Sequence, residues 1–316
     1  MISVIIPTHH PDLNVLRQVL DSIKTSNECE VVLVENPKKT KEVEELINEW
    51  YTGDTISVVH TESFVGANHA RNKGADVARG DVLFFTHDDV ILSRDILDKY
   101  IAAHIVYNAG VIGGPVNLRY TDGKPRWVNN LFETYLTKID HGHPYGMCPF
   151  RLQKEWDLDI PVSAANMSMT KRSFNELGRF NVSEGRIGRN LLNSNDELSL
   201  ISSSCKNRAL GIIYMPEANV THIIPKKKTT ENYFIRSAYG KGVSNFVSFS
   251  ALNPHLSKLE IYEKILIEHS SLLTNNATSF YTMFDGMQRV ERLYATKTYH
   301  KANNEYVNGI LSQVQI

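Results

Sequence analysis

Two adjacent carboxylates, Asp88 and Asp89, follow the apolar run Val82–Phe85 after two intervening residues. The run is typical of a buried strand, and carboxylates side by side repel each other unless a cation lies between them or one is protonated. Oxygen ligands of this kind suit Mg²⁺ or Mn²⁺, and these ions in turn bind diphosphates. The stretch indicates either a metal site at the end of a strand or two solvated aspartates, one of which caps the next helix.

Strand and helix patterns alternate through the first 92 residues, which must position these carboxylates. β-Branched and apolar runs predict strands, and apolar residues at helical spacing predict helices between them. The strands are expected at 3–6, 30–34, 55–59 and 82–85, with helices at 12–25, 43–50 and 66–78. This alternation predicts an α/β fold with a doubly wound, mostly parallel sheet and flanking helices, in which ligands bind where the strands end.

The rest of the chain is less regular until its last third. A helix is expected at 94–106, a strand with a tight turn at 111–116, and further strands at 162–169, 211–216 and 218–222. Apolar stripes at helical spacing predict helices over 255–312. These C-terminal helices are expected to pack on the core or to form a contact between copies in a homo-oligomer.

The composition is that of a globular protein without a bias toward nucleic acid. The chain has 316 residues, 42% of them hydrophobic and 22% charged, and its formal net charge is −1. No apolar run approaches the ~20 residues that span a bilayer, and the N-terminus lacks the pattern of a signal peptide. Three widely spaced cysteines fit a reducing compartment. We expect a cytoplasmic protein, with peripheral membrane contact left open.

Four segments of the N-terminal half resemble the inverting glycosyltransferases of family 2, which bind nucleotide sugars on a GT-A fold. The matching segments are residues 3–8, 32–36, 66–74 and 80–90, in the family's order and spacing. The resemblance implies hexosyl transfer from a nucleotide-diphosphate sugar, expected to be a UDP-sugar, to an acceptor hydroxyl, with Mn²⁺ or Mg²⁺ as cofactor. It divides the chain into a GT-A domain over 1–250, with a nucleotide-binding half (1–92) and an acceptor and catalytic half (93–250), and a helical extension over 251–316.

The resemblance also implies roles for residues at the strand ends. Glu35 stands where the family usually has an aspartate that meets uracil, and Arg71 is expected to face it across the base. Asp89 and His222 are the expected metal ligands, with His87, at the first position of the usual Asp-any-Asp motif, as a possible third. The other expected donor contacts are Pro7, Thr8, Asn36, Asp88, Asn166, Arg236 and Lys241. The family's closing strand pair matches 211–216 and 218–222.

The segment Asn195-Asp196-Glu197 is the candidate source of the catalytic base. Inverting transfer needs a base that takes the proton of the acceptor hydroxyl, and a helix N-terminus can hold a carboxylate beside a cleft. The family places an acidic pair at this point, so the resemblance implies that Asp196 is the base, with Glu197 as the alternative. Without the resemblance, the pattern favours ordinary helix capping by Asn195 with acidic residues in the first turn.

Two other classes of function compete with this interpretation. A nucleotidyltransferase would need a glycine-rich, lysine-bearing loop after the first strand, which residues 7–11 lack. A non-catalytic glycan- or partner-binding protein on a decayed scaffold is consistent with the departures at Glu35, His87 and Asn195. The basic stretch Lys226–Thr230 is either a lid over the diphosphate or a solvated loop.

Overall fold

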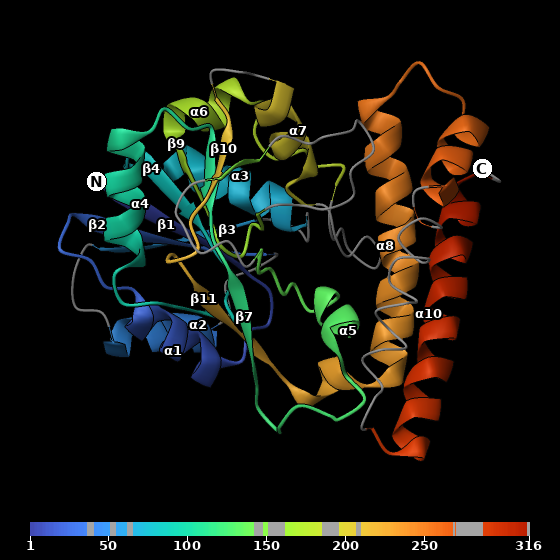
Figure 1. Ribbon diagram of the computed structural model, residues 1–316. Coiled ribbons are helices and arrows are strands. Elements are labelled where there is room, and N and C mark those ends of the chain that lie inside the picture. Colours follow the sequence, from blue (N-terminus) through green and yellow to red (C-terminus); the bar gives the residue numbers. More distant parts are fainter. Residues whose placement is uncertain are drawn as a thin grey trace.

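The computed structural model describes residues 1–36, 41–50, 55–61, 66–141, 148–150, 162–184, 196–206, 210–267, 269 and 287–314. Asn195, much of the irregular segment between 119 and 160, and part of the predicted C-terminal helices lie outside these ranges. The described chain folds around a large mixed sheet with helices on both faces and two long C-terminal helices beside it (Figure 1).

The main sheet has eight strands in the order β3-β2-β1-β4-β9-β6-β10-β8. Its first four strands are parallel, because each is connected to the next through a helix, whereas β9 and β8 run antiparallel to their neighbours. The strands are β1 (Ile2–Thr8), β2 (Cys29–Glu35), β3 (Ile56–His60), β4 (Val82–Phe85), β6 (Val111–Gly113), β8 (Cys148–Phe150), β9 (Met167–Thr170) and β10 (Ile212–Tyr214).

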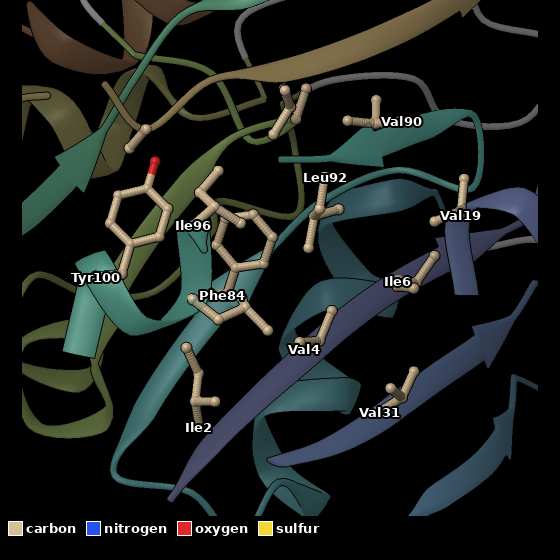
Figure 2. Packing of buried hydrophobic residues seen from close by; sticks show 14 of the residues in the cluster. Ile2, Val4, Ile6, Val19, Val31, Phe84, Val90, Leu92, Ile96 and Tyr100 are labelled. Carbon is tan, nitrogen blue, oxygen red and sulfur yellow. The ribbon is translucent and has the colours of Figure 1, made fainter. Parts of the chain in front are cut away.

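Alternating side chains of the central strands separate two apolar cores. Ile2, Val4 and Ile6 of β1 point to one face, where they pack with helices α1 and α4 (Figure 2), while Ile5 points to the other, against α3, α6 and α7. Both faces are therefore covered, as the alternation of strands and helices predicts. The helices are α1 (Leu13–Ser22), α2 (Lys41–Trp50), α3 (Ala67–Val77), α4 (Ile96–Val106), α5 (Asn130–Thr134), α6 (Lys171–Glu176) and α7 (Leu198–Lys206).

A second, three-stranded sheet carries the residues expected to bind metal. Its strands lie in the order β5 (Val90–Leu92), β11 (Val220–Ile224) and β7 (Val116–Tyr120). The antiparallel register of β11 with β5 places His222 opposite Val90, next to Asp89. The expected pairing of 211–216 with 218–222 is wrong, because β10 joins the main sheet and β11 joins the small one after a turn in which the Ala218 N–H donates to the Met215 carbonyl.

The C-terminal part consists of the short 3₁₀ helix η1 (Lys226–Thr229), helix α8 (Glu231–Leu252), a helical stretch over 258–267, and helix α10 (Arg289–Val314). Helices α8 and α10 lie side by side at one end of the molecule (orange and red in Figure 1). Their axes approach closely where Gly242 faces the Tyr306 backbone and Gly309 faces the Tyr239 backbone. Among the described helices, none combines the length and apolar character needed to cross a membrane.

The predicted fold class is confirmed: the chain has an α/β fold with a mostly parallel central sheet, flanking helices and C-terminal helices. The predicted boundary at residue 250 falls at the end of α8, against which α10 packs. The division into domains stays a prediction.

Candidate active site

The carboxyl ends of β1, β2 and β4 meet at one edge of the main sheet and bring several predicted donor contacts together. Thr8, which follows Pro7 at the end of β1, donates from Oγ1 to Oδ2 of Asp88 over 2.5 Å. Burial, and secondarily the charge of Asp89, raises the pKa of Asp88 to about 6. At the end of β2, the Asn36 side-chain oxygen accepts from Thr61, and Glu35 Oε2 lies 3.3 Å from His60 Nδ1.

Asp89 and His222 form a pair whose acceptor atoms converge. His222 Nδ1 lies 2.9 Å from the Leu136 carbonyl oxygen, which can only accept, so we assign the imidazole proton to Nδ1. His222 Nε2 then presents a lone pair 3.2 Å from Asp89 Oδ2. A histidine whose second nitrogen is anchored to a carbonyl is the usual arrangement at a metal site, because that hydrogen bond fixes the ring and the tautomer.

The pair fits an octahedral divalent ion. Two ligand atoms held at about 2.1 Å from one such ion and at a right angle lie about 3 Å apart, close to the 3.2 Å between Asp89 Oδ2 and His222 Nε2. No group of three His, Cys, Asp or Glu side chains suited to a metal occurs in the described part of the chain. Mg²⁺ and Mn²⁺ take most of their ligands from water and substrate phosphates.

Lys228 reaches the same two atoms, which the sequence did not predict. Its Nζ lies 2.9 Å from Asp89 Oδ2 and 3.3 Å from His222 Nε2. From the sequence, Lys226–Thr230 is either a lid or a solvated loop. The structure shows that these residues begin with η1, which follows β11 directly and brings Lys228 to Asp89 and His222. The predicted diphosphate contacts stay predictions: Arg236 is exposed on α8, and Lys241 Nζ lies 5.6 Å from the centre of the Tyr135 ring.

The Nε2 atom of His87 contacts Arg71, although the ring lies near the Asp89–His222 pair. Arg71, 1% exposed, places Nη2 at 3.0 Å from His87 Nε2, so this nitrogen accepts the guanidinium proton. Burial, followed by the charge of Arg71, lowers the pKa of His87 to about 3. A neutral His87 whose Nε2 is occupied by Arg71 does not fit the role of a third metal ligand through that nitrogen.

The expected arrangement of Glu35 and Arg71 across a uracil stays a prediction, and the contacts of both residues in this structure are with other side chains. Arg71 Nη1 pairs with Asp196 Oδ2 at 2.9 Å and donates to Asn68 Oδ1 at the same distance, with Phe180 beneath the guanidinium. Glu35 lies beside His60 at the end of β2. Helix α3 directs the Arg71 side chain toward Asp196, which lies 125 residues later in the chain. A partner so distant in sequence cannot be inferred from local spacing.

The two candidate bases lie in different environments. The Asp196 side chain is 20% exposed and paired with Arg71, and its Oδ1 has no hydrogen-bond partner among the described residues. Glu197 is buried, and burial, followed by the charge of Asp196, raises its pKa to about 7. Asn195 lies outside the described residues.

Asn166, an expected donor contact, is held by hydrogen bonds within the protein, and its contact with a donor stays a prediction. Its side chain is completely buried, and Oδ1 accepts from the Tyr100 hydroxyl over 2.6 Å. Its amide group donates to the carbonyls of Pro115 and Ala218 at 3.0 and 2.8 Å. Both amide protons are therefore used within the protein.

Solved structures with the same fold cover almost the whole chain. The mannosyltransferase PcManGT from Pyrobaculum calidifontis, solved with GDP-Man and Mn²⁺, superposes with a TM-score of 0.59 at 15% identity, over 99% of this chain and 86% of that one. S. aureus TarS (residues 1–349), solved with UDP-GlcNAc, gives a TM-score of 0.54 at 13% identity, over 99% and 91%. The likeness shows the fold, which is GT-A.

Sequence comparison identifies the family. A curated relative, an uncharacterized glycosyltransferase of Haemophilus influenzae (strain ATCC 51907 / DSM 11121 / KW20 / Rd), is 29% identical over 140 residues, which are 44% of each chain. The match thus spans less than half the length of that relative. The model of the family described as glycosyl transferase family 2 matches residues 3–178, more than half of the chain. The chain therefore belongs to glycosyl transferase family 2.

Proposed function

We propose that the chain is a metal-dependent inverting glycosyltransferase that moves a sugar from a nucleotide-diphosphate sugar, a UDP-sugar, to an acceptor hydroxyl. The observation that carries the proposal is the Asp89–His222 pair, whose two lone pairs converge 3.2 Å apart beside the end of β4. Family membership and the solved structures of PcManGT with GDP-Man and Mn²⁺ and of TarS with UDP-GlcNAc support it.

The metal end of the site consists of Asp89 and His222, which would hold Mn²⁺ or Mg²⁺. When bound, the ion stabilises the negative charge that develops on the departing diphosphate. The chain contributes the orientation: the Leu136 carbonyl fixes the His222 ring, and the β5–β11 register fixes its distance from Asp89. Such fixed second contacts usually matter for metal affinity because they set the ligand's direction before the ion arrives.

Asp196 is the proposed base, with Glu197 as the alternative. Arg71 holds one oxygen of Asp196, and the other has no partner among the described residues. In the proposed step, the acceptor oxygen forms a bond to the anomeric carbon as its proton passes to Asp196. The bond from that carbon to the diphosphate oxygen breaks on the opposite face, and the diphosphate leaves with the electron pair, so the configuration inverts.

The donor's nucleotide is proposed to lie along the ends of β1 and β2, where Pro7, Thr8, Glu35, Asn36 and Asp88 gather. Glu35, a buried carboxylate, can accept from the N3–H of uracil. Guanine is larger and presents a different edge, so a site shaped for this contact discriminates against it. The preference for UDP rests on this residue.

A competition series tests the nucleotide and the metal together. UDP, GDP, ADP and dTDP are titrated by calorimetry against the wild type with and without Mn²⁺, and against Glu35→Ala and Asp89→Ala. We expect Mn²⁺-dependent binding with UDP preferred, a loss of about 1–3 kcal/mol of UDP binding in Glu35→Ala, and no Mn²⁺-dependent binding in Asp89→Ala.

The matched control is Asp81→Ala, which removes an exposed aspartate at the opposite end of β4 and leaves both ends of the proposed site intact. Unchanged Mn²⁺-dependent UDP binding in Asp89→Ala overturns the metal assignment. A wild type that prefers GDP, or that shows no nucleotide preference, overturns the UDP-sugar donor and the role of Glu35. Donor hydrolysis in the same samples separates an enzyme from a non-catalytic binding protein.

A further inference from the structure

Two acceptor atoms face each other in the Asp89–His222 pair, and this arrangement needs a positive charge. The Leu136 carbonyl accepts a hydrogen bond from Nδ1–H of His222, so in the neutral imidazole Nε2 carries a lone pair. The carboxylate Oδ2 of Asp89, 3.2 Å away, also offers only lone pairs. Without a cation between them, the two atoms would repel each other in a largely buried place, where such repulsion is weakly screened.

Lys228 supplies that charge in this structure. Its ammonium group has three protons and no lone pair, and it lies within 2.9 Å of Asp89 Oδ2 and 3.3 Å of His222 Nε2. The contact to Nε2 independently requires that this nitrogen accept, which agrees with the tautomer set by Leu136. The neighbouring Lys226 and Lys227 are exposed, so the contact is particular to Lys228.

A divalent ion bound by the pair and the Lys228 ammonium cannot share this position. Both would lie within about 3 Å of the same oxygen and nitrogen, so like charges would be in contact. The Lys228 side chain is 24% exposed, and its four-carbon stem gives the ammonium a path away from the pair. When a nucleotide-sugar donor is bound, the displaced Lys228 ammonium could pair with its diphosphate, whose oxygens would lie next to a metal ion bound by Asp89 and His222.

We propose that Lys228 is a resident cation of the site, which neutralises Asp89 and donates to His222 when no metal is bound and competes with the divalent ion for them. The incoming donor relieves this competition, because its diphosphate accepts the displaced ammonium. Metal binding therefore depends on the nucleotide: it is weak to the protein alone and strong with UDP present. The inference rests on the metal-binding part of the proposed function and assigns Lys228 a role there.

The test measures Mn²⁺ affinity directly, without any transfer reaction. Free Mn²⁺ is followed by electron paramagnetic resonance as it is titrated into the full-length wild type, Lys228→Met and the matched control Lys227→Met, each with and without UDP. Lys228→Met keeps the apolar stem and removes the competing charge. We expect Mn²⁺ alone to bind this variant about tenfold or more tightly than the wild type, with Lys227→Met unchanged.

The effect of UDP provides the second result. UDP should increase Mn²⁺ affinity more in the wild type than in Lys228→Met. In the wild type the Lys228 ammonium can move from Asp89 to the diphosphate, and the variant has no ammonium that could do so. Equal Mn²⁺ affinity of Lys228→Met and the wild type overturns the competition, as does an equal gain in Lys227→Met. Absence of Mn²⁺ binding by every protein overturns both the competition and the metal dependence proposed above. If Lys228→Met does not fold, Lys228→Gln, which can donate to Asp89, replaces it.

Discussion

At the scale of single residues, Arg71 connects the two ends of the candidate site. Its guanidinium lies against Asp196 on one side and His87 on the other, and His87 lies beside the metal pair, with its ring centre 6.3 Å from that of His222. A buried guanidinium with two such partners holds both in place, because its planar donors fix directions as well as distances. The orientation of the proposed base thus depends on a residue of helix α3.

The assignment of the base can be tested by two isosteric substitutions. Asp196→Asn keeps the shape of the side chain and loses its capacity to accept a proton, so we expect transfer to fall by about 10²–10⁴-fold while donor binding is retained. Glu197→Gln should change transfer far less. The measurement is steady-state transfer together with calorimetric UDP binding. If Glu197→Gln is the impaired variant and Asp196→Asn is not, the base is Glu197.

The raised pKa of Glu197 predicts a pH-dependent stability. Its carboxyl holds its proton up to a pH of about 7 in the folded protein, against 4.5 in the unfolded chain. The stability from neutral, buried Glu197 is fully present below about pH 4.5 and is lost as the pH rises through about 7. In Glu197→Gln this loss, on the order of 3 kcal/mol, should be absent.

Urea denaturation of the wild type and Glu197→Gln between about pH 5 and about pH 8 measures this effect. All other titrating groups are shared by the two proteins, so the difference between their slopes reports on Glu197. Parallel slopes would show that Glu197 is ionised in the folded protein at neutral pH.

At the scale of elements, the strands that could be predicted from the sequence are those with apolar runs of their own. The segments at 3–6, 30–34, 55–59 and 82–85 correspond to β1, β2, β3 and β4. A buried parallel strand such as β1, β2 or β4 needs an apolar residue at nearly every position, whereas the edge strand β3 is half-buried and is recognised by its β-branched residues. The pairing of 211–216 with 218–222 was not predictable in the same way. Both segments are apolar, and their separation into two sheets depends on partners far away in sequence.

The candidate site shows the same limit. The sequence predicted the types of residue at the strand ends, and the fold brings Thr8 to Asp88 and Asp89 to His222. It did not predict the partners of Arg71 or the position of Lys228. A long charged side chain can reach many places, so its contact is set by backbone positions more than a hundred residues away.

The contact between α8 and α10 predicts a strong effect of a single methyl group. A Cβ at Gly242 would collide with the Tyr306 carbonyl oxygen, which belongs to helix backbone and has little freedom to move. Gly242→Ala should therefore destabilise the protein by about 1–3 kcal/mol, measured by thermal unfolding. Gly211→Ala is the control, since no described atom lies within 4 Å of a Cβ there. Equal melting temperatures would contradict the close packing.

At the scale of the whole molecule, Asn166 joins the two sheets. The carbonyls that it binds belong to Pro115, between β6 and β7, and Ala218, between β10 and β11. In each case the chain leaves the main sheet and enters the small one at this point. Since the small sheet carries His222, the distance between the metal pair and the rest of the site depends on this junction.

Asn166→Ala should uncouple the sheets. The Ala218 carbonyl and the Tyr100 hydroxyl lose a partner, while the Pro115 carbonyl keeps the Val220 N–H, so the change should cost about 2–4 kcal/mol of stability. Amide hydrogen exchange in β7 and β11 should accelerate more than exchange in β1 and β2, because the small sheet would open without the main one. Asn175→Ala, an exposed asparagine on α6, is the control. Equal acceleration in both sheets would show that they unfold as one unit.

The position of β4 has a consequence for synthesis of the chain. β4 lies between β1 and β9, and β9 follows roughly 80 residues later. At the usual pace of translation, Val82–Phe85 therefore spends about 4–16 seconds as an uncovered apolar edge with unpaired backbone groups. A ribosome that stalls within this interval leaves a nascent chain that is prone to aggregate. We expect a ribosome-associated chaperone to be needed most while residues 86–170 are being made. Synonymous codons that slow translation of this segment should lower the yield of soluble protein.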